Sequence, residues 1–230
     1  MGTLRIRAEA FASGRALRLA GVNVNPAPVG DVPAPRSFMA LEQRSFATSP
    51  TSVAEATVAF ARGLATAWVA ATVKHFPGIG RATRNTDQTA VEIAAMRTEL
   101  IRRDLVPFRS AIAAGAPIVM ISNATYPALD AKPAPWSTRI QFLLRHDVGF
   151  AGVTISDALD GAGATRGRTL PSVAALVAQA GVDLLLLTGS EASSAAAFER
   201  VVGTAEQGRI SPVALEASHA RIMELKRAYG

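Results

Sequence analysis

Ionisable and amide side chains stand directly after several short apolar runs of this 230-residue chain. Lys74 and His75 end one run, Asn123 follows the next, and Asp157 follows a third. A pocket that holds a lysine, a histidine and a carboxylate suits a ligand rich in hydroxyl groups, and Asp157 is a candidate nucleophile or base. The residue types therefore predict a polar binding or catalytic site assembled from strand ends.

Each of these residues also has a purely structural interpretation. An aspartate after a strand commonly caps the following helix, which would account for Asp157 or for Asp31. Lys74 could be a solvated lysine, and His75 could be a histidine satisfied within the core. Residue types alone leave both interpretations open.

Metal and phosphate chemistry are disfavoured by residue spacing. The three histidines, His75, His146 and His219, lie far apart and the chain has no cysteine, so we expect no metal site and no cofactor. The glycines in residues 76–80 and 161–163 match neither the dinucleotide-binding pattern nor the P-loop pattern. We therefore do not expect a nucleotide ligand.

Composition constrains the partners. A net charge of +6 and a pI near 10.7 are compatible with a polyanionic partner such as nucleic acid or an anionic cell wall. The basic residues are scattered and only 6% of residues are aromatic, so we predict no nucleic-acid binding. No segment reaches the roughly 18 apolar residues of a membrane span, and residues 1–18 lack a signal-peptide pattern. As written, the chain is expected to be cytoplasmic.

Strand-like and helix-like stretches alternate along the chain. Apolar runs bounded by Gly, Pro or Asn predict buried parallel strands at residues 22–24, 70–73, 117–122, 152–156 and 182–187. Helices are predicted at residues 53–68, 91–102, 106–114, 137–145, 172–180, 193–206 and 213–229. The proline-rich residues 25–38 predict an irregular loop.

This alternation predicts one α/β domain. The domain is either an open doubly wound parallel sheet or an incomplete (β/α)8 barrel, and the number of strands alone favours the open sheet. Both architectures place their working residues just after the carboxyl ends of the strands. The polar strand ends are therefore expected to converge in either case.

One segment resembles a specific family signature. Lys74-His75-Phe76-Pro77-Gly78-Ile79-Gly80 is similar to the Lys-His-Phe-Pro-Gly-His-Gly motif of family 3 glycoside hydrolases. Four further segments resemble that family in the same order: residues 21–32 its third-strand motif, 44–46 its Arg-Ser-Phe, 105–109 the helix before its fifth strand, and 154–157 its nucleophile strand.

The resemblance implies a TIM-type (β/α)8 barrel that lacks its first strands. Residues 1–230 would form a single family 3 N-terminal domain, incomplete at its N-terminus. The implied activity is hydrolysis of β-glycosides with retention of configuration, with Asp157 as the nucleophile and Arg44, Lys74 and His75 as ligands of sugar hydroxyls. The expected partner is a carbohydrate, either a β-linked amino sugar or a glucoside.

The chain departs from the family pattern at the acid/base position. In the β-N-acetylglucosaminidase branch, a loop after the Lys-His motif carries an Asp-x-His pair, and these two positions are Asn85 and Asp87 here. Asp87 could donate the proton instead, with Asn85 orienting it. Alternatively, residues 85–87 form an Asx turn or cap a helix that begins near Val91. The family's Ser-His-Ala is Ser122-Asn123-Ala124, which makes Asn123 a candidate substrate ligand.

A second departure concerns the sheet. Members of the family have two further strands before the third-strand motif, and this chain begins after them. The unpaired edges would have to be covered, paired in an oligomer or tolerated as instability, so a homo-oligomer that covers the barrel edges is one possible partner. If the chain is a fragment, the protein could instead be exported through a missing N-terminal segment. The leading prediction is a retaining β-N-acetylhexosaminidase-like hydrolase. The alternatives are a β-glucosidase-like hydrolase and a catalytically degenerate, carbohydrate-binding barrel.

Overall fold

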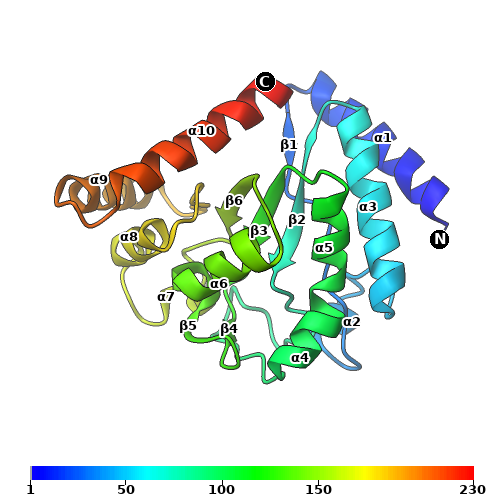
Figure 1. Ribbon diagram of the computed structural model, residues 1–230, viewed down its shortest axis with the longest axis horizontal. Coiled ribbons are helices and arrows are strands. Elements are labelled where there is room, and N and C mark those ends of the chain that lie inside the picture. The colour runs from blue at the N-terminus through cyan, green and yellow to red at the C-terminus, as the bar shows by residue number, and fades with distance from the viewer. Residues whose placement is uncertain (1) are drawn as a thin grey trace.

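The centre of the molecule is a four-stranded parallel sheet (Figure 1). The computed structural model describes residues 2–230. Its sheet strands stand side by side in the order β1 (Val24–Asn25), β2 (Ala70–Phe76), β3 (Ile118–Ile121) and β6 (Val153–Ser156). Beyond β6, Leu184 forms a parallel bridge with Ile155. Residues from all five predicted strand segments therefore lie in the sheet, the fifth through this bridge.

The strands follow one another in chain order without a reversal. A doubly wound sheet reverses its order at a switch point and carries helices on both faces. Consecutive right-handed crossovers instead place the helices on one face, as in a barrel. The chain is therefore part of a TIM-barrel-like α/β fold, and the doubly wound alternative is wrong.

Several of the longer helices carry a proline in their first turn. This holds for α3 (Pro50–Thr66), α5 (Val106–Ala113) and α8 (Leu170–Ala180), and α8 ends at Gly181, whose φ of +91° suits glycine. The other helical segments are α1 (Thr3–Leu19), α2 (Phe38–Leu41), α4 (Arg97–Glu99), the π-helical turns η1 (Leu100–Asp104) and η3 (Leu143–Asp147), the 3-10 turn η2 (Ala134–Trp136), α6 (Thr138–Phe142), α7 (Ala162–Thr165), α9 (Glu191–Glu206) and α10 (Pro212–Tyr229). None of the helices within residues 2–230 is long and apolar enough to cross a membrane.

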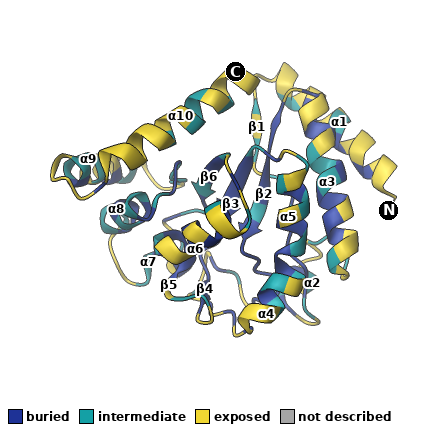
Figure 2. Ribbon diagram, in the orientation of Figure 1, coloured by how far each residue is buried: buried dark blue, intermediate teal, exposed yellow. Residues whose placement is uncertain are grey.

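The two faces of the sheet are covered differently. Val119 belongs to the main core together with Phe108 of α5 and Val177 of α8. Its neighbour Ile118 points to the other face and packs in a smaller cluster, which Leu225 and other residues of α10 cover. Buried residues accordingly concentrate on the strands and the helices that face them, whereas α10 is mostly exposed (Figure 2). In Figure 1, α10 runs across the end of the sheet at which the strands begin.

Helix α1 packs along α3 through small residues. A Cβ atom on Gly63 would lie 2.4 Å from the carbonyl oxygen of Arg7, and one on Gly14 would lie 2.8 Å from the Cβ atom of Ala67. Such close packing does not need a long apolar stripe, which is the feature that predicts a helix from sequence. Residues 3–19 are therefore helical although no strong pattern marks them.

The prediction of a helix at residues 91–102 is wrong in its first half. Val91, Ile93 and Ala95 are buried and the residues between them are exposed, which is the period of an extended chain. Glu92 forms a parallel bridge with Thr125, the first residue of a hairpin made by β4 (Thr125–Tyr126) and β5 (Asp130–Pro133). Helical structure begins only at α4.

Candidate active site

The ends of the three central strands lie level with one another. Phe76 of β2 pairs with Ile121 of β3, and Ile121 pairs with Ser156 of β6. The backbone N–H of Asp157 then donates to the carbonyl of Ile121 at 2.9 Å. Lys74 and His75 were expected just after a strand but belong to the last part of β2 itself, whereas Asn123 and Asp157 do follow β3 and β6. All four therefore lie toward the same end of the sheet, as the strand-end rule requires.

Asp31 holds His75 from inside the protein. Both residues are buried, with 0% and 4% of their surface exposed. A carboxylate oxygen of Asp31 lies 2.7 Å from Nδ1 of His75, and the carboxylate also accepts the backbone N–H of His75 at 3.3 Å and that of Ile79 at 2.7 Å. An ionised carboxylate only accepts hydrogen bonds, so Nδ1 carries the proton and Nε2 remains as the second functional nitrogen.

This pairing excludes the capping role considered for Asp31. The next helix after it is α2, which begins at Phe38 and is capped by Ser37. The position of Asp31 at a strand end does not by itself define its function. The hydrogen bond between Asp31 and His75 joins two positions 44 residues apart, and no local sequence pattern predicts it.

Five ionisable residues at the rim influence one another electrostatically. Burial lowers the pKa of Lys74, the negative charge of Asp157 opposes this, and the positive charge of Arg44 lowers the pKa further. Partial burial of the carboxyl and the charge of Asp157 raise the pKa of Asp87, whereas His75 and Arg44 lower it. These mutual effects show that the charged groups lie close to one another.

Asn85 and Asp87 form the Asx turn that was considered as an alternative. Oδ1 of Asn85 accepts the backbone N–H of Asp87 at 2.9 Å. The turn orients residue 87 through its backbone and leaves the carboxyl group of Asp87 at the rim. The helix-capping alternative is wrong, because the chain is extended at Val91.

Asp157 stands on a short loop rather than at the start of a helix. Helix α7 begins five residues later with Gly161 at its N-cap, so the capping interpretation of Asp157 is also wrong. One carboxylate oxygen of Asp157 accepts the N–H of Ala158 at 2.9 Å, and the residue is partly exposed. Asp157 is thus fixed in orientation and accessible.

Asn123 and Arg44 differ in their access to a ligand. Asn123 is fully buried, and its Nδ2 donates to the carbonyl of Ala158 at 2.8 Å. It therefore supports the Asp157 loop and offers no accessible surface in this conformation. Arg44 is exposed, with its guanidinium carbon 5.6 Å from the ring centroid of Phe38, and it can reach over the rim.

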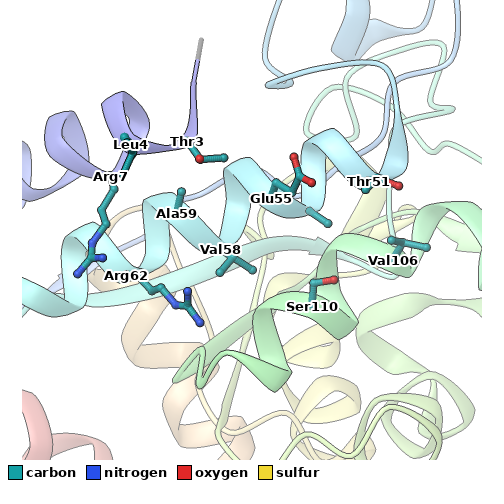
Figure 3. A pocket seen from close by; sticks show the side chains of 11 residues that line it. Thr3, Leu4, Arg7, Thr51, Glu55, Val58, Ala59, Arg62, Val106 and Ser110 are labelled. Carbon is teal, nitrogen blue, oxygen red and sulfur yellow. The ribbon is translucent and has the colours of Figure 1, made fainter.

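One hollow on the described surface lies away from this rim. It has a volume of about 600 Å³ and lies between α1, α3 and α5 (Figure 3). Arg7 and Arg62 line one end and Glu55 lies further along the groove, and all three are exposed. Across residues 2–230, no group of three or more His, Asp or Glu side chains could hold a metal ion.

Comparison with known proteins defines the family. The family model described as Glycosyl hydrolase family 3 N terminal domain matches residues 5–225, and the chain belongs to this family. It is 38% identical to a β-hexosaminidase of Stenotrophomonas maltophilia (strain K279a) over 177 residues, which make up 76% of this chain and 52% of that protein.

Solved structures confirm the fold. A family 3 β-N-acetylglucosaminidase from Paenibacillus sp. str. FPU-7 superposes with a TM-score of 0.95 and 31% identity, over 99% of this chain and 44% of that one. A β-N-acetylhexosaminidase from Beutenbergia cavernae DSM 12333 superposes with a TM-score of 0.88 and 31% identity, over 98% of this chain and 69% of that one. The chain spans about half the length of the curated relatives it matches.

Proposed function

We propose that this protein is a retaining β-glycoside hydrolase of the β-N-acetylhexosaminidase type, with Asp157 as the nucleophile and Asp87 as the acid/base. The observation that carries the proposal is the presence of two carboxyl groups with unlike environments at one rim. Asp157 adjoins cationic Lys74, whereas partial burial and the charge of Asp157 raise the pKa of Asp87. Such a difference separates an ionised nucleophile from a protonated acid.

The two residues would act in two steps. The Asp157 carboxylate attacks the anomeric carbon and forms a glycosyl ester, while the bond to the glycosidic oxygen breaks and that oxygen takes the proton of Asp87. In the second step Asp87, now ionised, accepts a proton from water, and the water oxygen attacks the anomeric carbon and releases Asp157. Two inversions retain the β configuration.

The remaining rim residues would hold the sugar. Lys74 and Arg44 carry hydrogen-bond donors suited to hydroxyl oxygens, whereas Nε2 of His75 can accept a hydroxyl hydrogen because the Asp31 carboxylate holds the proton on Nδ1. Groups held in this way position the anomeric carbon relative to the nucleophile. Asn123 contributes by supporting the Asp157 loop. None of these steps uses a metal or a cofactor.

A β-linked N-acetylhexosaminide is the substrate class that the names of the relatives support. A β-glucoside is the alternative within the same chemistry. One observation favours a different class, a carbohydrate-binding barrel without turnover: Asp87 occupies the place at which the similar branch of the family carries a histidine. Binding and hydrolysis are therefore tested together.

The deciding experiment is intact-protein mass spectrometry after incubation with 5-fluoro glycosyl fluorides of N-acetylglucosamine and of glucose. Fluoride leaves with little proton donation, so the reagent tests the nucleophile separately from the acid. We expect a covalent adduct that maps to Asp157 with the amino-sugar reagent and none with Asp157→Asn. A folded protein that stays unlabelled by both reagents but binds the saccharides would instead establish the binding barrel.

We also propose that copies of the chain associate through the open sheet edges. Val22 and Val24 are exposed at the β1 edge, and residues 184–187 are only partly buried beyond β6. Unpaired strand edges with apolar side chains favour pairing with another strand. Both edges belong to a parallel sheet, so two chains related by a twofold axis along the strands could pair both edges at once.

A further inference from the structure

The loop that carries Asp87 lies directly against the first turn of α7. The backbone N–H of Ala162 donates to the carbonyl of Asp87 at 2.8 Å, and that of Gly163 donates to the carbonyl of Thr86 at 2.9 Å. Free N–H groups at a helix start need such partners. The segment 161–163, which matches no phosphate-binding motif, is thus engaged by the protein's own loop.

The two glycines of this segment make the contact sterically feasible. A Cβ atom on Gly163 would lie 2.4 Å from the carbonyl oxygen of Thr86, and one on Gly161 would lie 3.1 Å from the Cα atom of Asp87. Gly161 has a φ of −64°, which any residue can adopt. Gly163 is therefore required for space, whereas a Cβ atom at Gly161 would shift its neighbours by a few tenths of an ångström.

The far end of the same loop is held by Thr125. The N–H of Thr125 donates to the carbonyl of Val91 at 2.9 Å, and the N–H of Ile93 donates to the carbonyl of Thr125 at 2.8 Å. Arg166, which follows α7, hydrogen-bonds the hydroxyl of Thr125. The loop of residues 85–93 is therefore hydrogen-bonded to α7 near its start. Near its end it is hydrogen-bonded to Thr125, which itself bonds Arg166.

We propose that Gly161 and Gly163 are positioning residues for the reaction, because the surface they form fixes the Asp87 carboxyl group relative to Asp157. This inference rests on the proposed function. Gly161 lies four residues after Asp157 in the same loop, so a shift of the Asp87 loop on α7 changes the separation of the two carboxyl groups directly. A retaining mechanism needs these groups about 5–5.5 Å apart.

The test compares Gly163→Ala with Gly203→Ala. The control glycine lies in α9, and a Cβ atom there meets nothing within 4 Å. In Gly163→Ala we expect kcat/KM for an N,N′-diacetylchitobiose substrate, which needs proton donation, to fall about 100-fold, because a displacement of about 1 Å has that effect. Labelling of Asp157 by the fluoride reagent should stay within about threefold of wild type, because it needs little acid help. Gly203→Ala should change neither rate.

Hydrogen exchange of residues 85–93 gives a readout that does not depend on activity. We expect faster exchange there in Gly163→Ala and unchanged exchange in Gly203→Ala. Gly161→Ala, with its milder 3.1 Å contact, serves if Gly163→Ala does not fold. Full activity in a folded Gly163→Ala variant, or an equal loss in both rates, would overturn the inference. Absence of labelling in folded wild type would instead overturn the proposed function, and unchanged exchange would then overturn the docking of the loop.

Discussion

The Nδ1 atom of His75 lies 2.7 Å from a carboxylate oxygen of Asp31, and solvent reaches almost none of either residue. The carboxylate also accepts two backbone N–H groups, from His75 in β2 and from Ile79 in the turn after it, so three donors surround it. A buried charge with this many donors orders the chain around it. The buried Asp31 carboxylate thus holds the rim residue His75 in place from the interior of the protein.

Asp31→Asn is expected to change the tautomer of His75. The variant removes the charge and presents an amide that can donate to Nδ1, which favours the proton on Nε2. Imidazole 15N shifts report this directly, since only three histidines are present and His146→Gln and His219→Gln complete the assignment. We expect kcat/KM to fall about 5–10-fold, because Nε2 of His75 would no longer accept a hydrogen bond from the substrate and one such bond contributes about 1–1.5 kcal/mol.

The control for this experiment is Asp147→Asn, because Asp147 forms an exposed ion pair with Arg97 at 3.4 Å. Exposed ion pairs contribute little to stability, so neither the 15N shifts of the His75 ring nor kcat/KM should change in this variant. Identical His75 nitrogen shifts in wild type and Asp31→Asn would show that the carboxylate does not set the tautomer.

Asp87→Asn is expected to stabilise the folded protein at neutral pH. Partial burial and the charge of Asp157 raise the pKa of Asp87 above its ordinary value of 3.8, so ionisation of this group is less favourable in the folded state than in the unfolded one. The destabilisation is absent below the unfolded-state pKa and complete above the folded-state pKa. Thermal melts should therefore give a higher Tm for Asp87→Asn at neutral pH, and a difference that vanishes under strongly acidic conditions. A lower Tm at neutral pH would contradict this environment for Asp87.

The same substitution should separate the two chemical roles. Turnover of a substrate with a poor leaving group needs protonated Asp87, so it should decline as pH rises through the raised pKa, and Asp87→Asn should remove this decline and slow turnover by about 10²–10⁴-fold. Added azide should restore turnover of an activated aryl glycoside by attacking the glycosyl ester, giving the β-glycosyl azide. An unchanged rate and pH profile in Asp87→Asn would assign the proton transfer to another residue.

Asp183→Asn is expected to lower stability without touching the rim. Asp183 accepts hydrogen bonds from Arg145 at 2.7 Å, from Arg221 at 2.6 Å and from the N–H of Thr154 at 2.8 Å. Burial alone would raise the pKa of Asp183, but the bonds from Arg221 and Thr154 and the charge of Arg145 outweigh it and lower the pKa. Breaking one side of such a buried pair costs about 3–5 kcal/mol.

The pH dependence of this contribution follows from the lowered pKa. The stabilisation is fully present above the unfolded-state pKa of Asp183 and is lost as pH falls through the folded-state value. Urea denaturation should give a free energy of unfolding that is much lower for Asp183→Asn than for wild type at neutral pH, and a smaller difference in acid. A loss of unfolding free energy at neutral pH no larger than that caused by Asp147→Asn would refute the stabilising role of this network.

Association through the sheet edges is tested by sedimentation. We expect sedimentation velocity to give a dimer mass for the 230-residue chain and a monomer mass for Val24→Lys, because a charge at an edge strand opposes pairing. Val213→Lys is a matched control, since Val213 is exposed on α10 and belongs to no sheet edge. A wild-type monomer across the micromolar range would rule out edge pairing.

Local patterns predict most of the strands. Apolar runs at residues 70–73, 117–122 and 152–156 became β2, β3 and β6, because burial on both faces selects continuous apolar sequence. The sequence predicts a helix at residues 91–102, but pairing with Thr125 makes residues 91–95 extended, with alternate side chains buried. The sequence did not predict helix α1, because α1 packs on α3 through glycine contacts and has no long stripe of apolar residues.

The sequence by itself determined the strand segments, the polar residues at their ends and the family, because these follow from local periodicity and from a motif contiguous in the chain. The tertiary structure alone decided which polar residues meet. The pairing of His75 with Asp31, the burial of Asn123 beneath the Asp157 loop and the docking of the Asp87 loop on Gly161 and Gly163 all join distant segments. Their energies depend on distances and on exclusion of water, which exist only once the strands are in register.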